Sequence, residues 1–176
     1  MTEKNDTSRL NKKYIFRNIR QEEIAQAAEI EKICFPPNEA CSYEHMEDRV
    51  KKAPELFLVA EDRDTGKIAG FLNGLATDRE HLTDDFFTDA EVHDPKGKNI
   101  MLLGLDVLPE YQRRGLAREL VRCYKEREKA NGREKLILTC LPDKVEMYQK
   151  FGFKDHGIGD SVWGGEAWHE MSVELR

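Results

Sequence analysis

A basic, glycine-containing corner is the part of this sequence best suited to binding an anion. It consists of Gln112, Arg113, Arg114, Gly115, Leu116 and Ala117. An apolar, β-rich run over residues 99–109 precedes it, and apolar residues follow at helical spacing as far as Tyr124. The N–H groups of a first helical turn lack intrahelical acceptors, and the helix dipole adds positive potential there. The corner therefore predicts a cradle for a phosphate or pyrophosphate.

The residue types at the corner fit this interpretation. Glycine at 115 lets the backbone approach a ligand closely, the small Ala117 keeps the surface clear, and Arg113 and Arg114 add positive charge. The spacing is neither GxxxxGK[ST] nor GxGxxG, so a P-loop and a dinucleotide-binding turn are both excluded here.

Composition bounds the class of protein. The 176 residues suit one domain, residues 1–176, and the sequence leaves open whether residues 1–13 form a flexible segment. The net charge of −6 argues against nucleic acid as the main partner, since phosphates attract basic faces. The polar amino end has no signal-peptide core, and no apolar run reaches membrane-spanning length. We therefore expect a cytoplasmic protein with no membrane partner.

The cysteines and other metal-ligating side chains show no ligand spacing. The four cysteines form no CxxC pair, and we interpret them as reduced thiols. No His, Cys or Asp arrangement has the spacing of a metal site, so we predict no metal.

The order of elements predicts an α+β (mixed α/β) fold. Strands are expected over residues 14–19, 56–61, 68–76, 100–107, 135–140, 153–159 and 166–175, and helices over 21–33, 42–51, 115–129 and 144–151. The acidic stretch 77–94 reads as a short helical turn and loop. Together these favour a mostly antiparallel central sheet of about seven strands with helices on both faces.

Three blocks, taken in order, resemble one family. Residues Gln112–Ala117 match the (Q/R)xxGx(G/A) pattern of the GCN5-related N-acetyltransferases (GNAT). The preceding "LGLDVLPEYQRRG" is similar to that family's central strand, and "LTCLPDKVEMYQKFGF" to its later strand and helix. The resemblance runs from Ile15 to Leu175. Residues 29–61, including "CFPPNEACS", resemble the serotonin (aralkylamine) N-acetyltransferase subgroup, of the microbial or non-vertebrate type.

The resemblance implies a GNAT-like fold and acetyl-CoA as cosubstrate. Its pantetheine arm would bind along Leu105, Asp106 and Val107, pairing with the backbone of Leu105 and Val107 like an added strand. Its pyrophosphate would meet the corner from Gln112 to Ala117. Many relatives dimerise, and the sequence leaves open whether this chain does.

The resemblance also suggests catalytic residues. Tyr148 stands at the family's general-acid position and would protonate the leaving thiolate; the alternative is a packing role beside Phe151 and Phe153. The two histidines that relay a proton in vertebrate serotonin enzymes correspond here to Met101 and Leu103, so that relay is absent. Insect members use a glutamate in the loop after the first helix, which makes Glu39 the candidate base; it could equally be a solvated loop residue. His81, His93 and Asp106 are weaker candidates.

The acceptor site would be built from the same loop. Phe35 and Pro36 are the candidate substrate-binding residues, with residues 77–94 and Trp163 or Trp168 as further candidates. The function predicted is transfer of an acetyl group to a small primary amine, of arylalkylamine or polyamine type, in a ternary complex. The alternatives are acetylation of a protein N-terminus or lysine, and a non-catalytic acyl-CoA-binding module.

Overall fold

Seven strands form one sheet in the order β1-β2-β3-β4-β5-β7-β6. The computed structural model describes residues 3–176. All neighbouring strands are antiparallel except β4 and β5, which run parallel. The strands are β1 (Tyr14–Asn18), β2 (Phe57–Asp62), β3 (Ile68–Thr77), β4 (Asn99–Val107), β5 (Lys135–Cys140), β6 (Lys154–Ile158) and β7 (His169–Glu174). The predicted fold class is confirmed.

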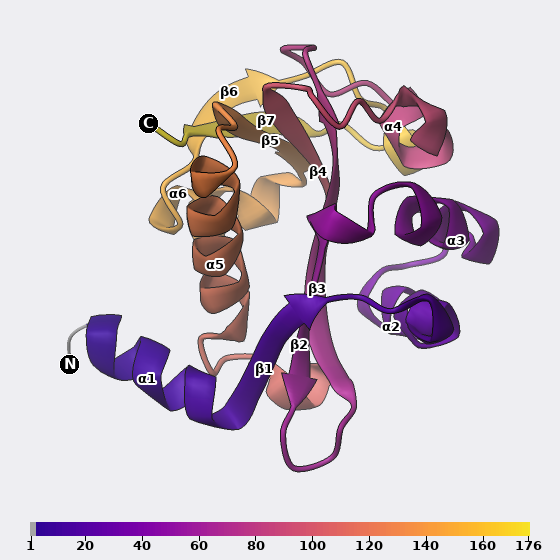
Figure 1. The fold of residues 1–176 in the computed structure, drawn as a ribbon. Coiled ribbons are helices and arrows are strands. Elements are labelled where there is room, and N and C mark those ends of the chain that lie inside the picture. Colours follow the sequence, from indigo (N-terminus) through magenta and orange to yellow (C-terminus); the bar gives the residue numbers. More distant parts are fainter. Residues whose placement is uncertain (1–2) are drawn as a thin grey trace.

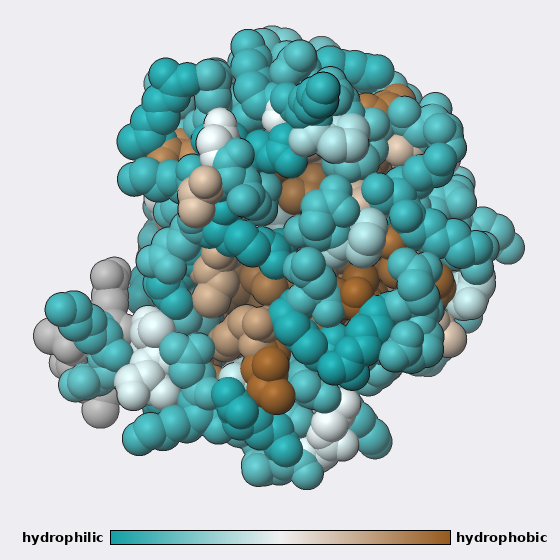
Figure 2. All heavy atoms as spheres, viewed as in Figure 1, coloured by the Kyte–Doolittle hydropathy of each residue, from teal (hydrophilic) through white to brown (hydrophobic). Residues whose placement is uncertain are grey.

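Helices cover both faces of the sheet. They are α1 (Glu3–Lys13), α2 (Ile24–Cys34), α3 (Tyr43–Lys52), α4 (Asp85–Thr88), α5 (Leu116–Ala130) and α6 (Val145–Lys150). Figure 1 shows α2 and α3 on one side of the strands, with α1, α5 and α6 on the other. Around this sheet the outer shell is mainly hydrophilic, and apolar side chains show chiefly near the middle of the face drawn in Figure 2.

The two helical layers are held by separate apolar clusters. Leu116, Leu120 and Tyr124 of α5 pack into one cluster with the central strands. Ile24, Ala27 and Ile30 of α2 pack into the other, against Met46 and Val50 of α3. These residues recur every three or four positions, which places them on one face of each helix. Ser42 is the N-cap of α3, because its Oγ accepts the His45 N–H at 3.1 Å.

The sheet divides after the first third of β4. Only Asn99, Ile100 and Met101 pair with β5, whereas β4 continues beside β3 as far as Val107. The register with β3 shifts between Asn73 and Gly74, so Leu103 is one extra residue in β4. The edge of residues 102–107 that faces β5 therefore has no strand partner in the described part of the chain.

The amino-terminal segment is a helix that the sequence pattern did not predict. Helix α1 packs beside α5, with Leu10 buried and Arg9 Nη2 donating to the Arg114 carbonyl at 3.0 Å. The acidic stretch does contain the expected helical turn, α4. Among the helices described for residues 3–176, none has the length and apolar character needed to cross a bilayer.

Candidate active site

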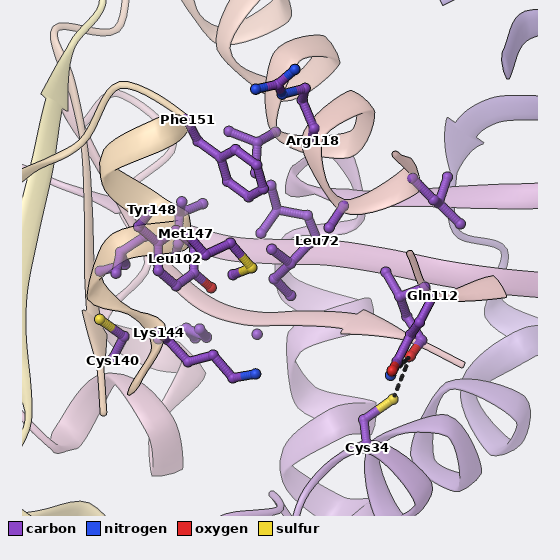
Figure 3. Close-up of a pocket in the computed structure, with 18 of the residues that line it drawn as sticks. Cys34, Leu72, Leu102, Gln112, Arg118, Cys140, Lys144, Met147, Tyr148 and Phe151 are labelled. Atoms are coloured by element: carbon purple, nitrogen blue, oxygen red, sulfur yellow. Dashed lines mark hydrogen bonds between the residues drawn. The ribbon is translucent and has the colours of Figure 1, made fainter. Parts of the chain in front are cut away.

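A cavity of about 1100 Å³ lies where β4 and β5 diverge. Its lining includes Leu105 of β4, Leu138 of β5, Cys34 of α2 and Ala117 of α5, so it is reached from both helical layers. In Figure 3, Lys144, Met147 and Tyr148 point into it from one side, and Cys34 and Gln112 lie on the opposite side. Most of the residues predicted for the cosubstrate and the acceptor therefore line one space.

The corner predicted to bind an anion lies at the start of α5. Gly115 is the N-cap with φ of 85°, a left-handed conformation in which a glycine is favoured. A Cβ added there would meet Arg9 and Leu10 of α1 at 3.8 Å, which is ordinary van der Waals contact without crowding. Gln112, Arg113, Leu116 and Ala117 line the cavity with it. Arg114 does not line it; its carbonyl is bound by Arg9.

The predicted strand residues divide between the two faces of β4. Leu105 and Val107 line the cavity, whereas Asp106 does not and its side chain is fully buried. The Val107 carbonyl already accepts from Gln112 Nε2 at 2.9 Å and from Cys34 Sγ at 3.4 Å, the contact dashed in Figure 3. Alternation along a strand explains the division, because neighbouring side chains point to opposite faces. Any contact of Asp106 with the cosubstrate would be through its backbone.

Tyr148 lies on α6 at the edge of the cavity. Its ring makes edge-on contacts with Phe151 and Phe153, at centroid distances of 6.0 and 5.7 Å. Burial, then Cys140 and Asp106 nearby, raises the pKa of Tyr148 above its usual value. The phenol is therefore protonated at neutral pH and can donate a proton. Tyr148 both packs on Phe151 and Phe153 and lines the cavity. A packing role and a role as general acid are therefore compatible.

Glu39 lies in the loop between α2 and α3, and this loop is bound to a distant turn. Trp163 Nε1 donates to the Glu39 carbonyl at 2.7 Å, and Asn38 Nδ2 donates to the Gly164 carbonyl at 3.1 Å. The half-buried Glu39 side chain lines the cavity. Partial burial, followed by Glu166 and Asp143, raises the pKa of Glu39. A carboxylate with a raised pKa is better matched to removing a proton near neutral pH.

The end of the cavity beside Glu39 is aromatic. Phe35, Pro36, Trp163 and Trp168 line it, and so does Phe87, which stacks on Trp163 at 5.0 Å. Phe87 comes from the acidic stretch, but the carboxylates of that stretch do not line the cavity. Several bind elsewhere: Asp84 accepts from Ser161, Asp85 from Arg79 and Glu80 from Lys98. Of the stretch 77–94, which was a further candidate for the acceptor site, only the aromatic ring of Phe87 lines the cavity.

The weaker candidates for a base lie away from the cavity. His93 is buried between the Ala76 N–H and Glu55, and His81 binds Glu170 near the surface. Leu103 lines the cavity and Met101 is buried, so the positions of the relay histidines carry no proton acceptor.

The cavity residues that the sequence analysis did not predict include two buried charged side chains. Glu31 of α2 and Arg49 of α3 both line the acceptor end, and each is only 3% exposed. Each lies on the apolar stripe of its helix: Glu31 follows Ala27 and Ala28, and Arg49 follows Met46. A charged residue at a buried helical position is the signal that could have found them.

Comparison with known proteins identifies the family. Residues 24–153 match the model of the acetyltransferase (GNAT) family. The fold and the cavity define a domain of the acyltransferase class, and the chain belongs to the GNAT family. Acetyl-CoA, the cosubstrate expected from the sequence, is that of this family, and the glycine cradle and unpaired β4 edge fit it. No group of three or more His, Cys, Asp and Glu within residues 3–176 is arranged to hold a metal ion.

Individual relatives are distant. The chain is 28% identical over 158 residues to the probable hydrolase YhcX of Bacillus subtilis, covering 86% of this chain and 30% of that protein. The chain therefore spans less than a third of that relative's length. The loading GNATL domain of CurA from Lyngbya majuscula is similar in fold, with a TM-score of 0.79 and 18% identity over 92% of this chain and 98% of the other. YncA of Salmonella typhimurium, solved with acetyl-CoA, gives a TM-score of 0.63 and 15% identity, over 93% of this chain and 94% of the other.

Proposed function

We propose that the protein transfers the acetyl group of acetyl-CoA to a small primary amine while both are bound. The observation that carries this proposal is the single cavity that joins the α5 cradle to the aromatic chamber around Glu39. A direct transfer needs both substrates in one space with the reacting atoms about 3 Å apart. The partial resemblance to aralkylamine N-acetyltransferases agrees with an aromatic chamber.

The cradle and the adjoining helices suit the phosphates of the cosubstrate. The free N–H groups at the start of α5 and the left-handed Gly115 provide a backbone site for an anion. Arg113, Arg118, Lys125 and Lys144 bring positive charge to the same cavity. The unpaired edge of β4 offers N–H and C=O groups to an extended arm. When bound, the cosubstrate supplies an acetyl group activated as a thioester.

The aromatic chamber around Glu39 suits a cationic molecule. Glu31, Glu39 and Asp143 line it or its rim, against Arg49 as a buried cation. Phe35 and Trp163 offer aromatic faces that attract an alkylammonium or stack on a ring. A carboxylate-rich, aromatic wall therefore favours an amine over an anionic acceptor.

The amine must lose a proton before it can attack. An alkylamine with a pKa of ~10 is almost entirely protonated at pH 7, and deprotonation then costs roughly 4–5 kcal/mol. In this proposal Glu39, at the solvent-facing rim, takes that proton. Tyr148 donates a proton to the departing sulfur from the other side of the cavity.

Two hydrogen bonds across the acceptor end of the cavity favour a small acceptor over a protein. The Trp163–Glu39 and Asn38–Gly164 hydrogen bonds tie the loop after α2 to the turn before β7. A protein chain would need an open groove there. The acceptor class is therefore proposed as free amines.

The test is release of free CoA thiol from acetyl-CoA over a panel of acceptors. The panel holds phenethylamine, tryptamine, serotonin, putrescine, spermidine, lysine and a short peptide. Turnover of one class of amine is expected. Acetyl-CoA binding without turnover of any amine would contradict the proposal, and turnover of the peptide alone would move the acceptor to proteins.

A further inference from the structure

Two carboxyl groups, Glu31 of α2 and Asp106 of β4, are buried between the helix and the strand. Glu31 is 3% exposed and Asp106 is 0% exposed. Glu31 Oε2 accepts the Cys41 N–H at 3.0 Å. Within the described residues, no donor reaches Glu31 Oε1 or either oxygen of Asp106. Three carboxyl oxygens without a donor in a protein interior call for a proton, a ligand or both.

The two groups share one region of space. A Cβ placed on Gly104 would lie 3.1 Å from Asp106 Oδ1 and 3.6 Å from Glu31 Oε1. Two buried carboxyl groups that interact directly, as these do, are not both ionised. Burial, with Glu31 beside it, raises the pKa of Asp106 well above its usual value, against a smaller opposing effect of Arg49. Asp106 therefore keeps its proton, and Glu31 is the neighbouring carboxyl group that can accept a hydrogen bond from it.

The other side chains that face Glu31 and Asp106 cannot accept a proton at neutral pH. Arg49 approaches from α3, where it donates to the Phe87 carbonyl at 3.0 Å and supplies the balancing positive charge. Burial raises the pKa of both Cys34 and Cys41 to about 12, so these thiols stay neutral. From α6, Tyr148 also stays protonated, because burial raises its pKa.

Glu31 alone connects the pair to the cavity. Glu31 lines the acceptor end of the cavity, whereas the buried side chain of Asp106 does not line the cavity. A substrate N–H group in the chamber can therefore reach Glu31 but not Asp106. The second lone pair of Glu31 Oε1 remains free to accept it.

Amide formation from an ammonium ion breaks two N–H bonds, and the rim carboxylate accounts for only one. We propose that Glu31 accepts the second proton, the one that nitrogen loses as the C–N bond forms, and that Asp106 is a positioning residue acting through Glu31. This inference rests on the proposed function. The first proton leaves through Glu39 to solvent. The C–S bond breaks as the C–N bond forms, and the leaving sulfur takes a proton from Tyr148. Tyr148 is protonated again when Glu31 releases the proton that it received.

The test compares neutral, isosteric variants on the amine turned over fastest. Glu31→Gln should lower kcat about 100-fold, the range of a positioned general base. The Kd of acetyl-CoA should be unchanged, because Glu31 lies on the acceptor side. Glu29→Gln, on the exposed face of the same helix, is the matched control and should match the wild type. Glu31→Asp should recover part of kcat because it retains a carboxylate.

Asp106 is tested by coupling and by pH. Asp106→Asn should lower kcat less than Glu31→Gln does and should shift the acidic limb of the kcat profile, which a purely structural role would not move. The double variant should be no slower than Glu31→Gln alone, because the two groups act as a unit. An infrared carbonyl band of a protonated carboxylic acid should be present at pH 7 and absent in Asp106→Asn.

The outcomes separate this inference from the proposed function. A wild-type enzyme that acetylates no amine overturns both. An active wild type with Glu31→Gln within twofold of it, or with an unchanged pH profile, overturns this inference alone. Loss of the acidic limb in Glu39→Gln together with an unaffected Glu31→Gln would make Glu39 the only base.

Discussion

The indole Nε1 of Trp163 donates a 2.7 Å hydrogen bond to the backbone carbonyl of Glu39. The two residues are 124 positions apart, yet this contact fixes the loop that carries the candidate base. Trp163 is itself held by Phe87, which stacks on it, and by Trp168 Nε1, which donates to its carbonyl at 2.8 Å. The position of Glu39 is thus set by the last fifth of the chain.

Replacing this indole should weaken amine binding selectively. Trp163→Phe keeps the stacking on Phe87 but removes the donor, and one such hydrogen bond contributes about 0.5–1.5 kcal/mol. We expect KM for the amine to rise roughly 3- to 10-fold. The Kd of acetyl-CoA should not change, and Val162→Ala, at an exposed neighbouring position, should behave as wild type. Equal KM values in Trp163→Phe and wild type would show that the bond does not order the loop.

The glycine of the cradle should be essential for cosubstrate binding. Gly115→Asp places a side chain and a negative charge where the phosphates are proposed to bind, so binding of acetyl-CoA should be lost. Gly132, at the other end of α5, is a matched control with φ of 83° and open space around its Cβ position. Gly132→Asp imposes the same left-handed strain of about 1–2 kcal/mol. It should lower the melting temperature without changing the Kd measured by calorimetry.

The phenol of Tyr148 should matter for chemistry and not for cosubstrate binding. Tyr148→Phe keeps the ring contacts with Phe151 and Phe153, and should reduce kcat about 100-fold. The Kd of acetyl-CoA should stay constant. Because the pKa of Tyr148 is raised, the wild-type kcat should not fall on this group's account between pH 7 and 9. Tyr43→Phe, at an exposed position, is the control, and an unaltered kcat in Tyr148→Phe would remove Tyr148 as the acid.

The charge around Glu39 should set the acidic limb of the pH–rate profile. The ionised carboxylate is the active form, so kcat/KM falls as the pH drops through its pKa, which Glu166 raises. Glu166→Gln lowers that pKa and should move the Glu39 limb to lower pH. Glu39→Gln should remove the contribution of Glu39 and leave only the limb that Asp106→Asn shifts. Glu146→Gln, on an exposed side chain of α6, should leave the limb in place. A limb unaffected by either Glu39→Gln or Glu166→Gln would assign the titration to another group.

The buried proton on Asp106 should appear in the pH dependence of stability. The pKa of Asp106 is raised in the folded state, so above the usual carboxyl pKa the folded protein holds a proton that the unfolded chain has released. This contribution to stability is fully present below the unfolded pKa and is lost as the pH rises. Asp106→Asn removes the effect, so its free energy of unfolding relative to wild type should increase from pH 4 to pH 7 in urea titrations. A constant difference would show that Asp106 is ionised in both states.

The sequence by itself determined the order of the strands and most of the helices, and it indicated the proposed cosubstrate side. The features proposed to bind phosphate in Gln112–Ala117 are local: helix-start N–H groups, a left-handed glycine and a small residue. The apolar stripe of α2 and the cap at Ser42 are also short-range features of the sequence. Helix α1 was not predicted from the sequence. So polar a segment gives no strong periodic signal, and Leu10 is buried only against elements distant in the chain.

Only the tertiary structure decided the acceptor side. The chamber joins α2, α3, the acidic stretch and the turn before β7, so its wall depends on contacts between residues far apart in the chain. Sequence showed Phe87 as one more residue of an acidic loop and Asp106 as one more residue of a strand. Burial turned the first into an aromatic wall and the second into a protonated partner of Glu31. A carboxyl group's proton affinity depends on the charges and solvent that the folded chain places around it, and no local pattern encodes those.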